Sequence, residues 1–321
     1  MKKDTRIVCL GGGIGTVNLI RGIKTYFANV SVIISMADEG GSSGRLRRLF
    51  NMFPPGDLVS CMAAFYKGKH AFLPSLLTYR FPGNRYGKDT QLSGHKLGNL
   101  IMAGLIKDSQ TFDEAIGKFQ ALFAIEGEFI PATDTQVSIS AITVEGKEIV
   151  GEESIDLGRY NGQRVLESVK LHPRDATAQK KAIEAILGAD VVIAGPGDLY
   201  TTILPVLIVK NIRNALFKSS AKKVFVINVA NKPFETKGYD AIDYIKAVEK
   251  HLGAFPFKIV IVNNNHSISI PRKYHYHYVR SEDTQGFKKY GISLFLRDLV
   301  DEKFPLYHSS SKLAKTITDI I

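Results

Sequence analysis

Two glycine-rich segments near the N-terminus have the residue types that bind a phosphate. The first reads GGGIGT and directly follows the apolar run Arg6 to Leu10. Glycines between a strand and a helix let an anion approach the backbone amides at the helix N-terminus. A tight strand-to-helix turn that binds nothing would show the same pattern. The contacts predicted here are Gly11, Gly12, Gly13, Gly15 and Thr16.

The second segment reads DEGGSSGRLRR and follows the apolar run Val30 to Met36. Its glycines permit successive amides to converge on an anion, and its hydroxyls can donate to phosphate or cap the next helix. Arg45 can bind a phosphate through two parallel hydrogen bonds. Asp38, at the end of the second strand, stands where dinucleotide-binding proteins have the carboxylate that binds the ribose. The contacts predicted here are Asp38, Gly40, Gly41, Ser42, Ser43 and Arg45.

A third segment, GPGDLYTT, repeats the arrangement of an apolar strand followed by glycines and a helix. Asn228 ends a later apolar run and is a candidate by position. The contacts predicted here are Gly195, Gly197, Asp198, Tyr200, Thr201 and Asn228.

Two residues are candidates for catalysis. Asp57 follows a rigid Pro-Pro-Gly turn and can bind a metal or a hydroxyl, with a helix N-cap as the alternative. His95 lies four residues before Asn99, so both occupy one face of a predicted helix. His95 can act as a general acid or base, or cap the helix, and Asn99 is a candidate ligand contact. The residues themselves predict no metal site.

The elements that carry these segments predict an α/β fold. A strand, a glycine loop, a helix and a second strand within about 30 residues form a βαβ unit with both strands in one parallel sheet. The third glycine segment, which follows the run Ala189 to Ala194, continues this alternation of strands and helices into the second half of the chain. The sequence therefore predicts a single Rossmann-like domain over residues 1–321, with a doubly wound, mainly parallel sheet and its ligand crevice at the carboxyl ends of the strands.

Residues 126–171 have a different pattern, in which apolar and polar residues alternate. Alternation is typical of strands with one exposed face. A Glu-Gly-Lys turn at 145–147 adds a hairpin signal. This region is predicted to be a small antiparallel β insertion.

Composition narrows the class of partner and compartment. The 321 residues carry 42 Lys and Arg against 31 Asp and Glu, a net charge of +11 that favours anionic ligands. No nucleic-acid-binding motif accompanies the charge, which disfavours DNA or RNA as the partner. Cys9 and Cys61 lack metal or disulfide spacing, which fits a reducing cytoplasm. Prolines and an aspartate interrupt the longest apolar region, 189–209, so no membrane span is expected.

Seven blocks, taken in order, resemble the gluconeogenesis factor family of YvcK-like proteins, which are related to the CofD 2-phospho-L-lactate transferases. The blocks are GGGIGT, ADEGGSSGRLR, PPGDL, YRF, GHKLGNL, AGPGDLYTTILP and FETKGY. The resemblance implies a cytoplasmic Rossmann-like protein that binds nucleotide sugars of the UDP-N-acetylglucosamine type and links carbon metabolism to cell-wall synthesis and cell shape. It implies ligand contacts in the three glycine loops and at Asn228.

The CofD branch implies an alternative, a metal-dependent phospholactyl or phosphoryl transferase. In that case Asp38 or Asp57 would hold Mg²⁺ and His95 would position the acceptor. The binding-protein hypothesis requires no cofactor, and the sequence leaves open whether the protein is an enzyme. A homodimer built through the sheet layer is compatible with either hypothesis.

Several positions differ from the family pattern. Glu39 stands where the family has a second Asp, and Val59 with Ser60 replaces an Arg-Asn pair, which removes a cation beside Asp57. Tyr307 replaces the Arg of an Arg-His-Asp block whose arginine is expected to contact the nucleotide sugar. These differences are expected to alter affinity or specificity for a UDP-sugar.

Overall fold

Seven apolar strands form one parallel sheet at the centre of the protein. The computed structural model describes residues 4–321 and orders the strands β12-β10-β8-β7-β1-β2-β3. Every neighbouring pair is parallel. The prediction of a Rossmann-like, doubly wound parallel sheet is confirmed. The strands are β1 (Ile7–Gly11), β2 (Val30–Ile34), β3 (Glu128–Pro131), β7 (Val191–Ala194), β8 (Lys222–Val226), β10 (Ile259–Asn263) and β12 (Ser293–Arg297).

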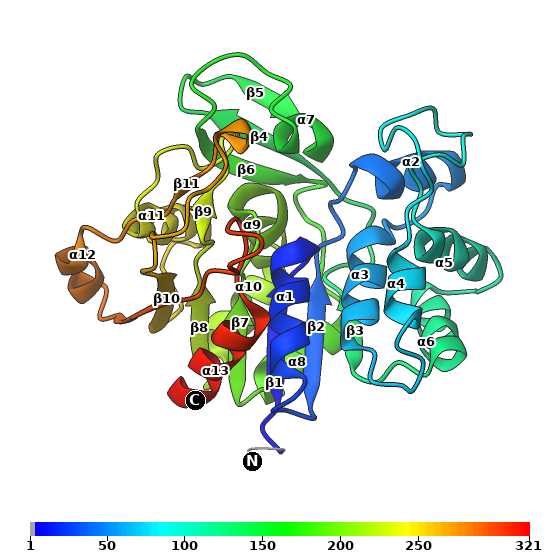
Figure 1. Ribbon diagram of the computed structural model, residues 1–321, viewed down its shortest axis with the longest axis horizontal. Helices are drawn as coiled ribbons and strands as arrows, with labels where there is room; N and C mark the ends of the chain where they lie inside the picture. The colour runs from blue at the N-terminus through cyan, green and yellow to red at the C-terminus, as the bar shows by residue number, and fades with distance from the viewer. Residues whose placement is uncertain (1–3) are drawn as a thin grey trace.

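Helices cover both faces of this sheet (Figure 1). On one face α1 (Gly13–Ile23) packs between α3 (Gly56–Phe65) and α13 (Ser310–Ile320), and on the other α8 (Lys180–Gly188) packs beside α10 (Lys210–Lys218). The remaining helices are α2 (Gly41–Phe50), α4 (Leu73–Thr78), α5 (Leu97–Lys107), α6 (Phe112–Phe123), α9 (Leu204–Leu207), α11 (Ala241–Leu252) and α12 (Thr284–Lys289), with short η1 (Leu199–Ile203) and η2 (Arg272–Tyr274).

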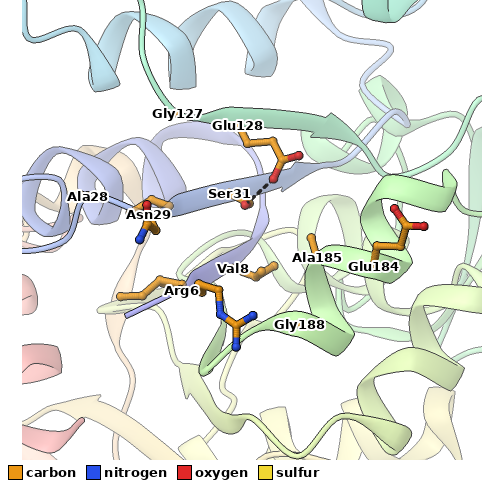
Figure 2. A pocket seen from close by; sticks show the side chains of 12 residues that line it. Arg6, Val8, Ala28, Asn29, Ser31, Gly127, Glu128, Glu184, Ala185 and Gly188 are labelled. Atoms are coloured by element: carbon orange, nitrogen blue, oxygen red, sulfur yellow. Dashed lines mark hydrogen bonds between the residues drawn. The ribbon is translucent and has the colours of Figure 1, made fainter. Parts of the chain in front are cut away.

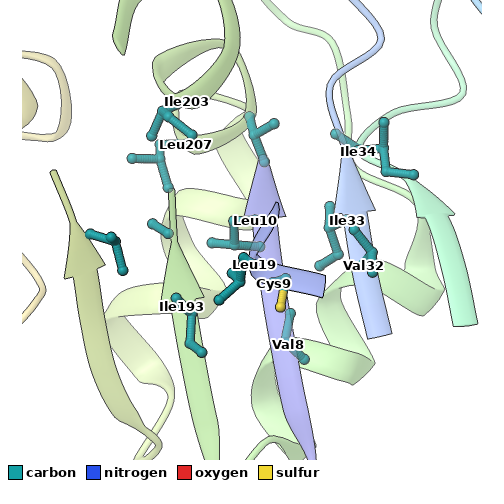
Figure 3. Packing of buried hydrophobic residues seen from close by; sticks show 14 of the residues in the cluster. Val8, Cys9, Leu10, Leu19, Val32, Ile33, Ile34, Ile193, Ile203 and Leu207 are labelled. Carbon is teal, nitrogen blue, oxygen red and sulfur yellow. The ribbon is translucent and has the colours of Figure 1, made fainter. Parts of the chain in front are cut away.

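The core lies between the strands and these helices. Figure 3 shows Val8 and Leu10 of β1 beside Ile193 of β7 and Val32 of β2, with Leu19 of α1 packed against them. All five side chains are buried. Continuous apolar strands of this kind need helices on both faces, because neither face can be left in water.

The order of the strands reverses beside β1. From β1 the chain moves through β2 to β3 at one edge, and it then returns to β7 on the other side of β1 and continues outward to β12. The loops that leave β1 and β7 therefore diverge, and a crevice opens between them at the carboxyl ends of the strands. This crevice is where the first and third glycine segments lie.

A three-stranded antiparallel sheet stands above the carboxyl edge of the central sheet (Figure 1). It contains β4 (Ser138–Thr143), β5 (Glu148–Val150) and β6 (Leu166–His172), with α7 (Glu152–Asp156) between β5 and β6. The turn at 145–147 joins β4 to β5 as expected. The predicted start of this insertion at residue 126 is wrong, because Glu128–Pro131 pairs in parallel with β2 as the edge strand of the central sheet.

Two local features complete the fold. After the third glycine segment, η1, α9 and α10 follow one another, with a break at Val209. A further pair of two-residue strands, β9 (Ala230–Asn231) and β11 (His277–Tyr278), folds a loop of the C-terminal part back over the end of β8. Within residues 4–321, no helix is both long and apolar enough to cross a membrane.

The contact between α1 and α13 depends on a glycine. A Cβ added to Gly22 would lie 2.1 Å from the carbonyl oxygen of Ser310 and 2.7 Å from Cβ of Ala314. Gly22→Ala is therefore expected to lower the free energy of unfolding by about 1–3 kcal/mol in urea denaturation. The matched control is Gly104→Ala in α5, where nothing lies within 4 Å of an added Cβ. The control should gain about 0.5–1 kcal/mol from helix propensity. Equal stability of the two variants would contradict this account of the packing.

Candidate functional site

A pocket lies in the crevice where the strand order reverses. It is lined by the loop after β1 (Gly12 to Gly15), the loop after β7 (Pro196 to Asp198) and Thr202. Residues 228–230 after β8 and two C-terminal segments, at Tyr276 and at 306–308, complete it. We call this the switch-point pocket. Of the predicted ligand contacts it brings together Gly12, Gly13, Gly15, Gly197, Asp198 and Asn228.

Close approach of the two glycine loops shapes the floor of this pocket. An added Cβ on Gly15 would lie 2.4 Å from the carbonyl oxygen of Pro196, and one on Gly12 would lie 2.4 Å from Oδ2 of Asp57. The two loops can meet only because Gly15 lacks a side chain, and Asp57 can approach the first loop only because Gly12 lacks one. The amide of Gly197 donates to Oδ1 of Asn228 at 2.9 Å, which fixes the second loop to the end of β8.

Asp38 and Asp57 form a buried pair of carboxylates beside the first loop. Asp57 accepts a hydrogen bond from the amide of Gly13. Burial, together with the charge of Asp38, raises the pKa of Asp57 to about 7. Asp38 accepts from the amide of Gly40 at 3.0 Å and from Ser43, and burial raises its pKa as well. The two groups therefore share their charge at neutral pH.

Lys96 supplies the cation that this pair needs. Its ammonium donates to Oγ of Ser60 at 2.8 Å and lies close enough to Asp57 and Asp38 to oppose the rise in their pKa values. The Arg-Asn pair of the family corresponds to Val59 and Ser60, and Val59 is buried in the core. Lys96, the residue that precedes α5, thus supplies the positive charge that the sequence comparison expected to be missing beside Asp57. The sequence offered no spacing signal for it, because Lys96 lies 39 positions further along the chain.

Arg45 has a different partner from the one expected. Its guanidinium donates to the backbone carbonyls of Ser93 at 2.6 Å, Lys88 at 2.5 Å and Gln91. The side chain is only 1% exposed. Arg45 holds the loop 81–95 onto α2, and this structural role replaces the predicted contact with a diphosphate.

Ser42, His95 and Asn99 form a buried hydrogen-bonded cluster away from the switch-point pocket. Oγ of Ser42 lies 2.9 Å from Nδ1 of His95 and accepts from Nδ2 of Asn99 at 3.1 Å. Burial lowers the pKa of His95, with a contribution from the charge of Arg45. His95 thus joins the start of α5 to α2 through Ser42, and its predicted role as a general acid or base stays a prediction.

Glu39 and Gly41 also face elements other than the pocket. Oε2 of Glu39 accepts from the amide of Glu152 at 3.2 Å, and Oε2 of Glu152 accepts from the amide of Glu39 at 3.2 Å. The longer side chain at this family-variable position therefore reaches α7. Gly41, with φ of +48°, packs against the side chain of Arg85.

Three more predicted contacts turn inward. The amide of Tyr200 donates to Oε2 of Glu235 at 3.1 Å, and the hydroxyl of Thr201 donates to Oε1 of Glu235 at 2.7 Å. Thr16 lies beneath the first loop, where its Oγ1 accepts from the amide of Gly12 at 2.9 Å. These side chains shape the loops rather than face a ligand, and Gly11 and Gly195 likewise lie at the bases of the loops, at the ends of β1 and β7. Thr202, which the sequence analysis did not select, lines the pocket instead.

Lys232 occupies the centre of an acidic cluster beside the pocket. Asp156 of α7, Asp198 and Glu235 have carboxylate oxygens within 4.8 Å of one another, the arrangement of a metal site. The ammonium of Lys232 bonds all three, at 2.7 Å from Asp198 and 3.1 Å from Glu235. Burial acts to lower the pKa of Lys232, but the carboxylates outweigh it and hold the pKa well above its usual value. These residues do not fit a metal ion, because a lysine already balances their charge.

Three further residues line the pocket although the sequence analysis did not select them as ligand contacts. Tyr276, Tyr307 and His308 line it from the C-terminal part of the chain. Tyr307 occupies the position of the family arginine, so that position does face the pocket. The stretch from Pro271 to Tyr276 contains η2 and a left-handed His275 with φ of +58°. No local spacing could indicate that these segments fold back over β1 and β7.

A second cleft lies at the opposite, amino-terminal end of the sheet (Figure 2). Arg6, Asn29 and Ser31 border it, and Oγ of Ser31 donates to Oε2 of Glu128 at 2.6 Å. Its cavity volume is about 640 Å³. None of the predicted ligand contacts lies there, and ligands of open α/β sheets bind at the carboxyl ends of the strands.

Comparisons with known proteins match the whole chain. Residues 7–300 match the family model described as 2-phospho-L-lactate transferase CofD. The gluconeogenesis factor of Bacillus subtilis is 33% identical over 325 residues, which cover 100% of this chain and 99% of that protein. The gluconeogenesis factor of Halalkalibacterium halodurans is 33% identical, with 99% and 97% covered. A crystal structure of a UPF0052 family member from Bacillus halodurans is 32% identical and superimposes with a TM-score of 0.88 over 99% of this chain and 100% of that one.

Removing the ammonium of Lys232 should destabilise the protein, because the acidic cluster loses its counter-charge. Lys232→Met leaves Glu235, which is 0% exposed, without its counter-charge. We expect the free energy of unfolding to fall by about 3–5 kcal/mol in urea denaturation at pH 7. The control is Lys237→Met, an exposed lysine on the same loop, which should change stability by less than about 0.5 kcal/mol. A Lys232→Met variant as stable as the control would show that the cluster does not depend on the ammonium.

Proposed function

The chain belongs to the gluconeogenesis factor family, within the wider CofD family, and on that premise we propose that it binds a nucleotide sugar in the switch-point pocket. The observation that supports this most is the meeting of two glycine loops at the crevice between β1 and β7. Nucleotides bind at this point in doubly wound sheets. The ligand proposed is of the UDP-N-acetylglucosamine type.

The first glycine loop offers free amides to a diphosphate. The amide groups in the first turn of α1 have no partners within the helix. Gly13 donates its amide to Asp57, so the amides of Ile14 and Gly15 remain for an anion. The N-terminal end of the helix dipole favours negative charge at the same place.

Acidic side chains around the pocket do not repel this anion, because their charge is already compensated. Asp57 has a pKa of about 7 and lies near Lys96, so it carries only part of a charge at neutral pH. Asp198 is paired with Lys232 at 2.7 Å. A diphosphate therefore meets a site close to neutral, with free amides on one side.

The size of the pocket indicates how such a ligand would lie. Its cavity volume of about 110 Å³ is below the roughly 300–1,000 Å³ of sites that enclose a whole ligand. One ring or one phosphate fits inside, and the rest of a nucleotide sugar would lie along the rim. Ile14 is 49% exposed and Tyr307 is 38% exposed at that rim, so an apolar and an aromatic surface are available to it.

The biological role that we propose follows from the family. A protein that binds a nucleotide sugar of cell-wall synthesis in the cytoplasm can sense its supply and regulate carbon metabolism, wall synthesis and cell shape. In this role the pocket binds reversibly and needs no cofactor. A homodimer is compatible with this role, since two sensors related by symmetry can share a partner.

Calorimetric titration with UDP-N-acetylglucosamine tests the proposed binding. We expect saturable binding that Gly15→Ala weakens at least about tenfold, because the new Cβ would lie 2.4 Å from Pro196 and force the loops apart. Gly104→Ala serves as the control and should bind as the wild type does. The proposal fails if the folded wild-type protein gives no binding heat with any uridine or guanosine nucleotide.

A transferase activity is a second candidate, and the Asp38 and Asp57 pair favours it. Two carboxylates beside a phosphate loop suit a Mg²⁺ ion that takes its other ligands from substrate phosphate and water, where it would neutralise developing charge. In this proposal an acceptor hydroxyl forms a new P–O bond to the group held by an activated nucleotide. The nucleoside monophosphate leaves as that bond forms, and Asp57 or Asp38 takes the hydroxyl proton.

Turnover separates this candidate from simple binding. If the transferase proposal is right, the protein releases nucleoside monophosphate from an activated donor only with magnesium, and Asp57→Asn lowers the rate at least about a hundredfold. Asp108→Asn, at a carboxylate whose side chain is 77% exposed, is the control. Binding without any release of nucleoside monophosphate would leave the sensor as the function.

A further inference from the structure

His308 lines the switch-point pocket, and one nitrogen of its ring has no hydrogen-bond partner in the part of the chain that the structure describes. The residue is 3% exposed and lines the pocket. Its Nε2 is buried and has no hydrogen-bond partner among residues 4–321. Buried polar atoms are nearly always paired, so an unpaired nitrogen in a residue that lines a ligand pocket indicates a partner that binds there.

The backbone fixes the position of this imidazole. The amide of Asp301 donates to the carbonyl of Tyr307 at 3.0 Å, and the amide of Ser309 donates to the carbonyl of Leu299 at 2.7 Å. Hydrogen bonds on both sides thus hold His308 against the segment that follows β12. The position of its Cα is therefore set before a ligand arrives, and burial confines the ring.

The chemistry of the free nitrogen follows from the bond that the ring already makes. The backbone carbonyl of Ile227 acts to raise the pKa of the imidazole, as an acceptor beside a ring N–H does. Because Nε2 is the nitrogen without a partner among the described residues, the ring proton is placed on Nδ1. Burial lowers the pKa of His308 to about 4, so the ring carries one proton at pH 7 and that proton is used. Nε2 is then an acceptor only.

Two other acceptors in the pocket are already bonded. Oδ1 of Asn228 accepts from the amide of Gly197, and Oδ2 of Asp198 accepts from Lys232. Two chemically different kinds of group therefore line the pocket. The amides of Ile14 and Gly15 offer donors to an anion, and His308 offers an acceptor.

We propose that Nε2 of His308 accepts a hydrogen bond from a hydroxyl or N–H group of the bound ligand and keeps phosphate away from that end of the pocket. This inference rests on the proposed nucleotide-sugar function. It makes His308 a residue that determines ligand orientation and specificity. A sugar hydroxyl, an acetamido N–H and an imide N–H of a base all satisfy it, whereas the ionised diphosphate of a nucleotide sugar has no proton to donate.

Nitrogen-15 NMR of histidine-labelled protein tests the proposal together with calorimetry. At pH 7 the free protein should show His308 as the Nδ1–H tautomer, identified by the signal lost in His308→Gln. Saturating UDP-N-acetylglucosamine should shift the Nε2 resonance, and sulfate, an anion without a proton to donate at pH 7, should leave it unchanged. His308→Leu should weaken binding at least about tenfold, whereas His308→Gln, which keeps an acceptor oxygen, should remain within about threefold of wild type. His70→Leu, at an exposed histidine outside the pocket, is the matched control.

Each other result overturns the inference. An Nε2–H tautomer, an Nε2 resonance that ligand does not shift, or wild-type affinity in His308→Leu would show that His308 does not accept from the ligand. If the wild-type protein binds no nucleotide at all, the proposed function fails separately. The tautomer of the free protein then decides this inference, because an Nδ1–H ring still offers an acceptor to another donor-bearing ligand and an Nε2–H ring does not.

Discussion

The absence of side chains at Gly12 and Gly15 is the constraint on which the site depends. An added Cβ on Gly12 would clash with the carboxylate of Asp57, and one on Gly15 would clash with the carbonyl of Pro196. At Gly15 the two halves of the doubly wound sheet come within contact distance. A methyl group there would separate the loops, and one at Gly12 would displace Asp57, so the pocket exists because the backbone itself forms its floor.

Charge compensation is the second requirement of this arrangement. Acidic residues from the first half of the chain, the second half and the insertion all converge above the carboxyl edge of the sheet. Lys96 opposes the charge of Asp38 and Asp57, and Lys232 joins Asp156 of α7 to Asp198 at the pocket. The insertion is thereby tied to the ligand loop by a buried ammonium, and movement of either would expose charges that are costly to leave unpaired.

Patterns local in the sequence predicted the fold well. The strands could be recognised as apolar runs, and the loops after β1 and β7 could be recognised by the glycines that follow those runs. Both signals lie within a few residues of one another. The edge strand β3 was misassigned, because a short strand that is half exposed at its start looks the same in a parallel edge and an antiparallel hairpin. The directions of side chains were harder to predict: Arg45 and Thr201 have the right chemistry for a ligand, yet backbone carbonyls and Glu235 take their donors. Lys96, Lys232 and His308 reach the site from distant segments and left no spacing to find.

A crystal structure of the protein with UDP-N-acetylglucosamine tests the central claim most directly, since it shows which end of the sheet binds the ligand and in which direction. Our account predicts the diphosphate on the amides of Ile14 and Gly15, with a hydroxyl or N–H of the ligand within hydrogen-bond distance of Nε2 of His308. Density for the ligand in the cleft at the amino-terminal end of the sheet (Figure 2), or a phosphate against His308, would contradict it.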